Sequence, residues 1–230
     1  MSLNGFQLKL IAAALMVLDH VQYYLPGNPL WFRYLGRLAA PVFFYLTVEG
    51  FFHTSSVPRF IARLTAGGLF MALGSRLAMH LAPWFLTLPN IFLSLATGVA
   101  MLWAIEWGQA NSRILEGSLL AALFAGLSLL TEASVYGVVM MLCFYFFRND
   151  RYSLGMAYIA LSLIPSLSAI TNPRMLLYDF QWMMVFALPL LYSYNGQRGP
   201  NTPLAKWFFY VFYPTHLWAL YIIGHRMSGT

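Results

Sequence analysis

Long apolar runs, separated only by short polar connections, are the feature of this sequence that most restricts its fold. A helix needs about 20 mostly apolar residues to cross the hydrocarbon core of a bilayer. Hydrophobic residues make up 60% of the 230 residues and charged residues 9%, whereas soluble domains have roughly 25% charged residues. So few charges do not cover the surface of a soluble protein of this length. The sequence therefore predicts an integral membrane protein built from helices.

About nine runs are long enough to span a bilayer, which predicts an all-α, polytopic transmembrane helix bundle. They cover roughly residues 6–24, 34–53, 60–81, 89–107, 114–130, 133–147, 152–170, 175–193 and 206–225. The fifth and sixth runs are short and are joined only by Thr131 and Glu132, so they also fit a single long or re-entrant segment. None of the connections is long enough to be a domain linker, so residues 1–230 are predicted to form a single domain.

The lysine and arginine residues predict the orientation of the bundle. With nine spans, one side of the membrane receives Lys9, Arg59, Arg63, Arg113, Arg148, Arg151, Arg198 and Lys206. The other side receives Arg33, Arg37, Arg76, Arg174 and Arg226. Because cytoplasmic loops are enriched in these residues, the N-terminus is predicted to be cytoplasmic. The net charge of +6 lies in such loops, so it indicates orientation and not a nucleic-acid partner.

Ionisable residues inside the apolar runs are the candidate functional residues, because a charge at the centre of a spanning helix costs about 2.5–3.5 kcal/mol. Asp19 and His20 lie roughly 20 Å along the first predicted helix, at about 1.5 Å per residue. Arg37 is expected at a similar level. One interpretation is a structural ion pair of Asp19 with Arg37 or Arg76. The other is a catalytic base, because an imidazole beside a carboxylate is a common general-base arrangement.

A second group of ionisable residues lies near the predicted cytoplasmic side. Glu49 and His53 are four residues apart, and so are Arg59 and Arg63, so each pair shares a helical face. The two arginines are predicted to form a basic mouth that binds a phosphorylated ligand. An ordinary positively charged cytoplasmic loop is the alternative interpretation.

His216 follows Pro214 near the middle of the last predicted helix. A proline frees a backbone carbonyl one turn earlier, so a kinked helix with the histidine bonded to nearby backbone is the structural interpretation. The histidines are too scattered to predict a metal site. The sequence contains no H-E-x-x-H metal motif, no G-x-S-x-G nucleophile elbow and no P-loop.

Three segments resemble the TraX family. They are LKLIAAALMVLDH at residues 8–20, GRLAAPVFFYLTVEGFFHT at residues 36–54 and FYPTHL at residues 212–217. The namesake of that family N-acetylates the pilin of F-type conjugative plasmids. The family in turn resembles a wider group of transmembrane acyltransferases, which includes the acyltransferase-3 proteins and the lysosomal heparan N-acetyltransferase.

This resemblance implies an acyltransferase of a bacterial inner membrane. The expected donor is cytoplasmic acetyl-CoA, and the expected acceptor is an amine or a hydroxyl on a protein N-terminus such as that of pilin, on a glycan or on a small molecule. The first-helix histidine, His20 in this chain, is the expected catalytic residue. The arginine-rich pair on a later helix of the acyltransferase-3 proteins has no clear counterpart in this sequence.

The resulting hypothesis gives each candidate residue a role. His20 acts as general base or as transient acyl carrier, and Asp19 tunes the local charge. Arg37 is expected to neutralise Asp19 or the developing oxyanion. Glu49 and His216 are expected to line the substrate cavity. The residues expected to bind acetyl-CoA are Arg59, Arg63, His53 and Tyr213. Two other classes stay open: a proton-coupled transporter or binding protein that uses Asp19 and His20, and a structural membrane subunit whose polar residues only lock helices together.

Overall fold

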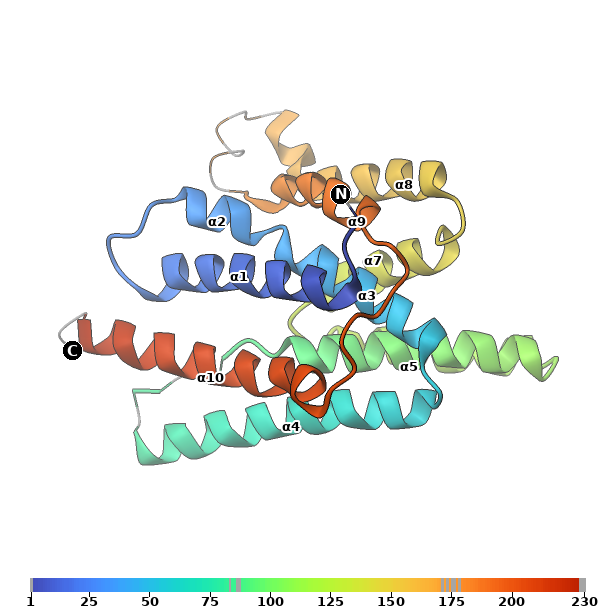
Figure 1. Ribbon diagram of the computed structural model, residues 1–230, viewed down its shortest axis with the longest axis horizontal. Coiled ribbons are helices and arrows are strands. Elements are labelled where there is room, and N and C mark those ends of the chain that lie inside the picture. The colour runs from blue at the N-terminus through green and yellow to red at the C-terminus, as the bar shows by residue number, and fades with distance from the viewer. Residues whose placement is uncertain are drawn as a thin grey trace. The chain divides into compact units, whose positions relative to one another are not determined.

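All regular structure in the described part of the chain is helical, apart from an isolated bridge between Leu3 and Tyr194. The computed structural model describes residues 2–82, 84–85, 88–170 and 179–227, together with Asn172, Arg174 and Leu177. The prediction of an all-α fold is confirmed. In chain order the helices are α1 (Gly5–Tyr24), α2 (Trp31–Gly36), α3 (Ala39–His53), α4 (Val57–Leu81), α5 (Ile91–Ala110), α6 (Ile114–Ser128), α7 (Ser134–Phe146), α8 (Arg151–Leu163), the 3₁₀ helices η1 (Ile164–Ile170) and η3 (Gln181–Ala187), α9 (Leu188–Tyr192) and α10 (Pro203–Met227) (Figure 1).

Two helical segments of the described residues are long and apolar enough to cross a membrane. They are Trp31–His53, which joins α2 to α3, and Ile91–Ala110, which is α5. Shorter apolar helices cover Ile114–Ser128, Ser134–Phe146 and Gln181–Tyr192. The prediction of about nine spans is therefore not confirmed. A helix of 15 residues such as α6 is only about 22 Å long, whereas the hydrocarbon core is about 30 Å thick.

Several predicted spans are interrupted in the structure. The helix predicted over residues 34–53 begins earlier, at Trp31. It is interrupted between α2 and α3, and Arg37 caps the end of α2. The predicted helix over residues 152–170 ends as an α-helix at Leu163 and continues as η1. Residues 114–147 form two separate helices, α6 and α7, and not one long segment. The run predicted over residues 175–193 begins outside the described residues and then forms η3 and α9.

The described residues form two compact units, and the prediction of a single domain stays a prediction. The first unit contains Met1–Leu46 and Phe147–Thr230. In this unit α1 lies between α2 and α10, and both neighbours pack directly against it (Figure 1). The helices α8, η1, η3 and α9 pack together as a second group, in which the buried hydroxyl of Tyr158 donates to the carbonyl oxygen of Met184. This arrangement leaves two opposite flanks of α1 facing different helices.

Polar side chains fix where the helices of the first unit begin. Asn4 caps α1 with a capping box, because its side chain accepts from the Gln7 amide at 3.0 Å and its own amide donates to the Gln7 side chain at 3.0 Å. Asp150 caps α8. Hydrogen bonds from the Ser153 hydroxyl and from the Tyr152 amide lower the pKa of Asp150. Each cap satisfies amide groups that have no partner within the helix.

The second unit, Thr47–Phe146, is built around the contact of α5 with α6. Gly108 on α5 meets Gly117 on α6, and a methyl group at Gly117 would lie 2.8 Å from the Ala104 carbonyl oxygen. The two backbones therefore approach more closely than any side chain allows. On its other flank α5 packs against α4, where the Asn90 side chain donates to the Gly68 carbonyl oxygen at 2.8 Å.

Replacing Gly117 with alanine is expected to lower the thermal stability of the detergent-solubilised protein. The added methyl group must push α5 and α6 apart, and overpacking of this kind costs about 1–3 kcal/mol. Gly126→Ala on the same helix is the matched control, because nothing lies within 4 Å of its Cβ position. Alanine there is expected to be neutral or to stabilise the protein by about 0.5–1 kcal/mol. Equal melting temperatures for the two variants would contradict the close contact.

Candidate functional site

Asp19 and Arg37 form a buried ion pair between α1 and the end of α2. Arg37 Nη2 lies 2.7 Å from Asp19 Oδ1 and 2.6 Å from Oδ2. The side chain of Asp19 is 12% exposed and that of Arg37 is 20% exposed. Of the two arginines predicted for Asp19, the structure places Arg37 at the carboxylate. Arg37 Nε is also buried, and it has no hydrogen-bond partner among the described residues.

Gly36 allows this ion pair to form, because it brings the α2 backbone against Asp19 itself. A methyl group at Gly36 would lie 2.8 Å from Asp19 Cα and 2.9 Å from Asp19 Cγ. Any larger residue would move α2 away from α1 and lengthen the bonds from Arg37. The glycine directly before the arginine is therefore part of the site.

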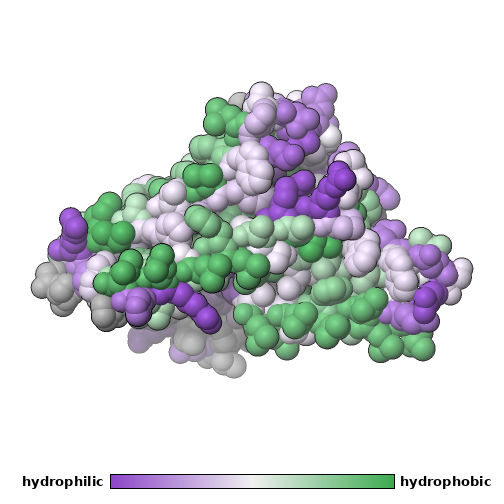
Figure 2. Space-filling model, turned by 90° about the horizontal axis from the view of Figure 1, so that it is seen from below, coloured by the Kyte–Doolittle hydropathy of each residue, from purple (hydrophilic) through white to green (hydrophobic). Residues whose placement is uncertain are grey.

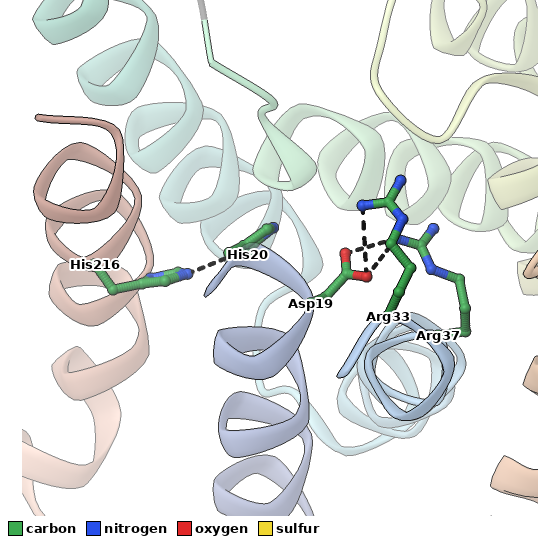
Figure 3. Close-up of polar contacts among 5 residues, drawn as sticks. All are labelled: Asp19, His20, Arg33, Arg37 and His216. Carbon is green, nitrogen blue, oxygen red and sulfur yellow. Dashed lines mark hydrogen bonds and ion pairs between the residues drawn. The ribbon is translucent and has the colours of Figure 1, made fainter. Parts of the chain in front are cut away.

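Arg33 is a second arginine at the same carboxylate, and the sequence reasoning missed it. Its Nη1 lies 3.7 Å from Asp19 Oδ1, and its guanidinium carbon lies 5.1 Å from the centre of the Tyr23 ring and 5.6 Å from that of Phe180. Figure 3 shows Arg33 and Arg37 converging on Asp19 from one side. Their four-residue spacing, which puts them on one helical face, was the signal available in the sequence. Two guanidinium groups around one carboxylate leave a surplus positive charge at this end of α1.

On another flank of α1, His20 contacts His216 of α10. His20 Nδ1 and His216 Nε2 are 2.9 Å apart, and His216 Nδ1 is 2.8 Å from the carbonyl oxygen of Phe212 (Figure 3). Both histidines are partly buried. The bond of His216 to nearby backbone is present, as the structural interpretation expected. The same ring also reaches across to α1, which that interpretation alone did not predict.

Neighbouring rings of α10 pack around His216, and a glycine and a ring contact between Tyr24 and Tyr221 at 5.8 Å hold α10 against the end of α1. The Phe212 ring stacks on His216 with centroids 4.9 Å apart, and the buried Tyr213 ring meets it edge-on at 5.7 Å. A methyl group at Gly224 would lie 3.0 Å from the carbonyl carbon of Tyr24. The ring of His216 therefore has little freedom to rotate, and its position relative to His20 is set by backbone packing.

The remaining predicted site residues lie in the second unit. Glu49 is buried, and its backbone oxygen lies 2.8 Å from Nδ1 of His53, whose side chain is 56% exposed. The two residues share a face of α3, as their spacing predicts. Arg59 is exposed in the first turn of α4, and Arg63 lies over the Phe60 ring at 5.8 Å. The expected roles of His53, Arg59 and Arg63 at acetyl-CoA, and of Glu49 along the substrate cavity, stay predictions.

These features define a class of protein: apolar helices among which α1 carries a buried ion cluster on one flank and, on another, a histidine that contacts His216 of α10. The chain belongs to the TraX family, because it matches the family described as TraX protein over residues 4–224. It is also 26% identical over 231 residues to the probable fimbrial assembly protein FimC, serogroup H1, of Dichelobacter nodosus, with 93% of each chain covered. No solved structure matches the chain.

Replacing Asp19 with asparagine is expected to destabilise the protein by about 3–5 kcal/mol, because removal of one partner leaves the Arg37 charge buried and unpaired. Chemical unfolding in detergent measures this change. Glu116→Gln is the matched control, since Glu116 pairs with Arg113 at 3.1 Å but both side chains are about half exposed. Solvent screens such a pair, so little change is expected there. Equal losses in the two variants would show that the Asp19 pair is not buried in the folded protein.

Proposed function

We propose that this chain is a multi-pass membrane acyltransferase that moves an acetyl group from cytoplasmic acetyl-CoA to an amine or hydroxyl acceptor. The observation that carries the proposal is His20, a partly buried imidazole held by His216 on one flank of a helix whose other flank carries a fixed ion cluster. Membership of the TraX family supports the same function. The family resemblance assigns the reaction to the first-helix histidine.

Exposed apolar side chains support the membrane location. On α4 and α6 they include Leu69, Phe70, Leu73, Leu77 and Leu81, and Ile114, Leu115, Leu119, Leu123 and Leu127. Figure 2 shows a face on which such side chains cover much of the surface. Soluble monomers rarely expose contiguous apolar patches of this kind, whereas a bilayer covers them favourably. We propose a bacterial inner membrane, as the family resemblance implies, with the N-terminus in the cytoplasm, as the lysine and arginine distribution over nine spans predicts.

The proposed reaction needs a base, and His20 supplies it. The imidazole takes a proton from the acceptor amine while the amine nitrogen attacks the thioester carbonyl carbon. The carbon–sulfur bond then breaks, the amide is released, and the proton returns from the imidazolium to the CoA thiolate. In the alternative route His20 itself accepts the acetyl group and passes it to the acceptor. Both routes convert acetyl-CoA and an amine into an acetamide and CoA.

The arginines have two proposed roles. Arg33 and Arg37 carry the surplus positive charge beside Asp19, and we propose that it stabilises negative charge on the substrates or on the developing oxyanion. Arg59 and Arg63 at the start of α4 are proposed to bind the CoA phosphates through their guanidinium groups. His53 and Tyr213 are further candidates for CoA binding. Glu49 is a candidate for lining the proposed substrate cavity.

The acceptor is proposed to be a fimbrial or pilin subunit. The Dichelobacter nodosus relative is described as a probable fimbrial assembly protein, and the family resemblance points to the N-terminus of pilin. An amine at a protein N-terminus also fits a histidine base that removes one proton.

The ion pair weighs against the transporter interpretation. Both carboxylate oxygens of Asp19 already bind Arg37, so Asp19 would have to break this pair in order to take up a transported proton. A structural subunit would explain the ion pair, because a buried pair orders helices. It would also explain a hydrogen bond between His20 and His216, so the acetyl-transfer assay is what distinguishes a structural subunit from an enzyme.

Purified protein in lipid nanodiscs is expected to transfer labelled acetyl from acetyl-CoA to a peptide with the N-terminal sequence of the host's own fimbrial subunit. His20→Ala is expected to lose at least about 100-fold in rate, because a general base contributes roughly 10²–10⁴-fold. His80→Ala is the control, since His80 is an exposed residue near the end of α4. Unchanged activity in His20→Ala would contradict the mechanism. Proton flux in proteoliposomes without any dependence on acetyl-CoA would favour the transporter.

A further inference from the structure

The hydrogen bonds around His216 define which nitrogen of each histidine carries a proton. A backbone carbonyl oxygen only accepts hydrogen bonds, so His216 Nδ1, 2.8 Å from the Phe212 oxygen, must carry a proton and donate it. In a neutral imidazole the other nitrogen is then a bare acceptor. His216 Nε2 is therefore the acceptor in its contact with His20.

The same reasoning then fixes the state of His20. Because His216 Nε2 accepts, His20 Nδ1, 2.9 Å away, must be the donor and must carry the proton of the neutral ring. His20 Nε2 is then left with a free lone pair. The chain of donors runs from His20 to His216 to the Phe212 carbonyl oxygen, and for a neutral pair no other arrangement satisfies both contacts. This is the tautomer that free neutral histidine in water populates less.

We infer that His216 is a positioning residue that holds His20 as the Nδ1–H tautomer and so presents His20 Nε2 as the reactive atom. This inference rests on the proposed function for its catalytic meaning. Nε2 lies on the far side of the ring from the bonded nitrogen, and Figure 3 shows that end of His20 turned away from His216. A base or an acyl carrier needs this bare nitrogen.

His216 is suited to this role because its own ring is held from several sides. The Phe212 ring stacks on it with an interplanar angle of 14°, and the Tyr213 ring meets it edge-on. Asp19 does not take this role, although a carboxylate orients the histidine in many hydrolases. Neighbouring residues on a helix diverge by about 100°, and the Asp19 carboxylate is bonded to Arg37. A second imidazole therefore stands where such enzymes place a carboxylate.

The test is nitrogen-15 NMR of the full-length protein, labelled at histidine, in lipid bilayers. The His20 signals are identified by their loss in His20→Gln. In the wild-type protein we expect a protonated Nδ1 and a bare Nε2 on His20. A protonated Nε2 on His20 in the wild-type protein would overturn the inference. Because the measurement is made on the wild-type protein, it does not depend on whether a His216 variant folds.

Variants of His216 separate positioning from simple packing. His216→Phe keeps a planar ring but removes the acceptor, so the His20 signals are expected to shift toward the Nε2–H tautomer. The acetyl-transfer rate is expected to fall on the order of 100-fold, the lower end of what a correctly protonated general base contributes. In His216→Gln the amide oxygen can accept from His20 Nδ1, so the tautomer and part of the rate are expected to return. An unchanged His20 tautomer in His216→Phe would overturn the role of His216.

The two hypotheses fail in different ways. Wild-type protein that shows the expected His20 tautomer but no acetyl transfer with any acceptor would overturn the proposed function. Wild-type protein that transfers acetyl groups but shows a protonated Nε2 would overturn the positioning role alone.

Discussion

A carboxylate on α1 and a guanidinium at the end of α2 lie 2.6 Å apart where little solvent reaches them. Neither charge is favourable alone in such a place, and together they are stable only in a narrow geometry. Gly36 makes that geometry possible, because a side chain there would collide with Asp19. The ion pair and the glycine together determine how α2 packs against α1. The orientation of α1 about its own axis follows from this contact.

Once α1 is oriented, the residue after Asp19 has a defined direction. His20 faces away from the α2 flank and meets His216 on α10. The position of α10 is set independently by the close contact of Gly224 with the end of α1. Two packing constraints on different flanks of one helix therefore fix the distance between two histidines that are 196 residues apart in the chain. This preorganisation is what a catalytic imidazole requires.

The sequence predicted those features that depend on a single helix or on charge pairing. The all-α class, the pairing of Asp19 with either Arg37 or Arg76 and the shared face of Glu49 and His53 follow from apolar runs, depth and four-residue spacing, and the structure places Arg37 at Asp19. The contact of His20 with His216 did not follow, because it depends on how α10 packs against α1. Arg33 was missed because it was counted as a loop charge and not as the partner of Arg37 on the same helical face.

The number of membrane spans was predicted least well, for a physical reason. Hydrophobic composition identifies segments that avoid water, but it does not show where a helix tightens or stops. The run that becomes α8 and η1 is mostly apolar, yet it changes to 3₁₀ geometry at Ile164, directly before Pro165. A proline lacks the amide that an α-helix uses, so composition alone overestimated the length of the helix.

The most direct measurement of the central claim is a structure of the protein in a lipid nanodisc with a non-hydrolysable acetyl-CoA analogue. If His20 is the base or the acyl carrier, the acetyl carbonyl carbon must lie within about 6 Å of His20 Nε2, the reach of one hydrogen bond plus one attack distance. The account predicts that position, with the Asp19–Arg37 pair intact. An analogue bound with its acetyl group far from the end of α1 would contradict the assignment of catalysis to this site.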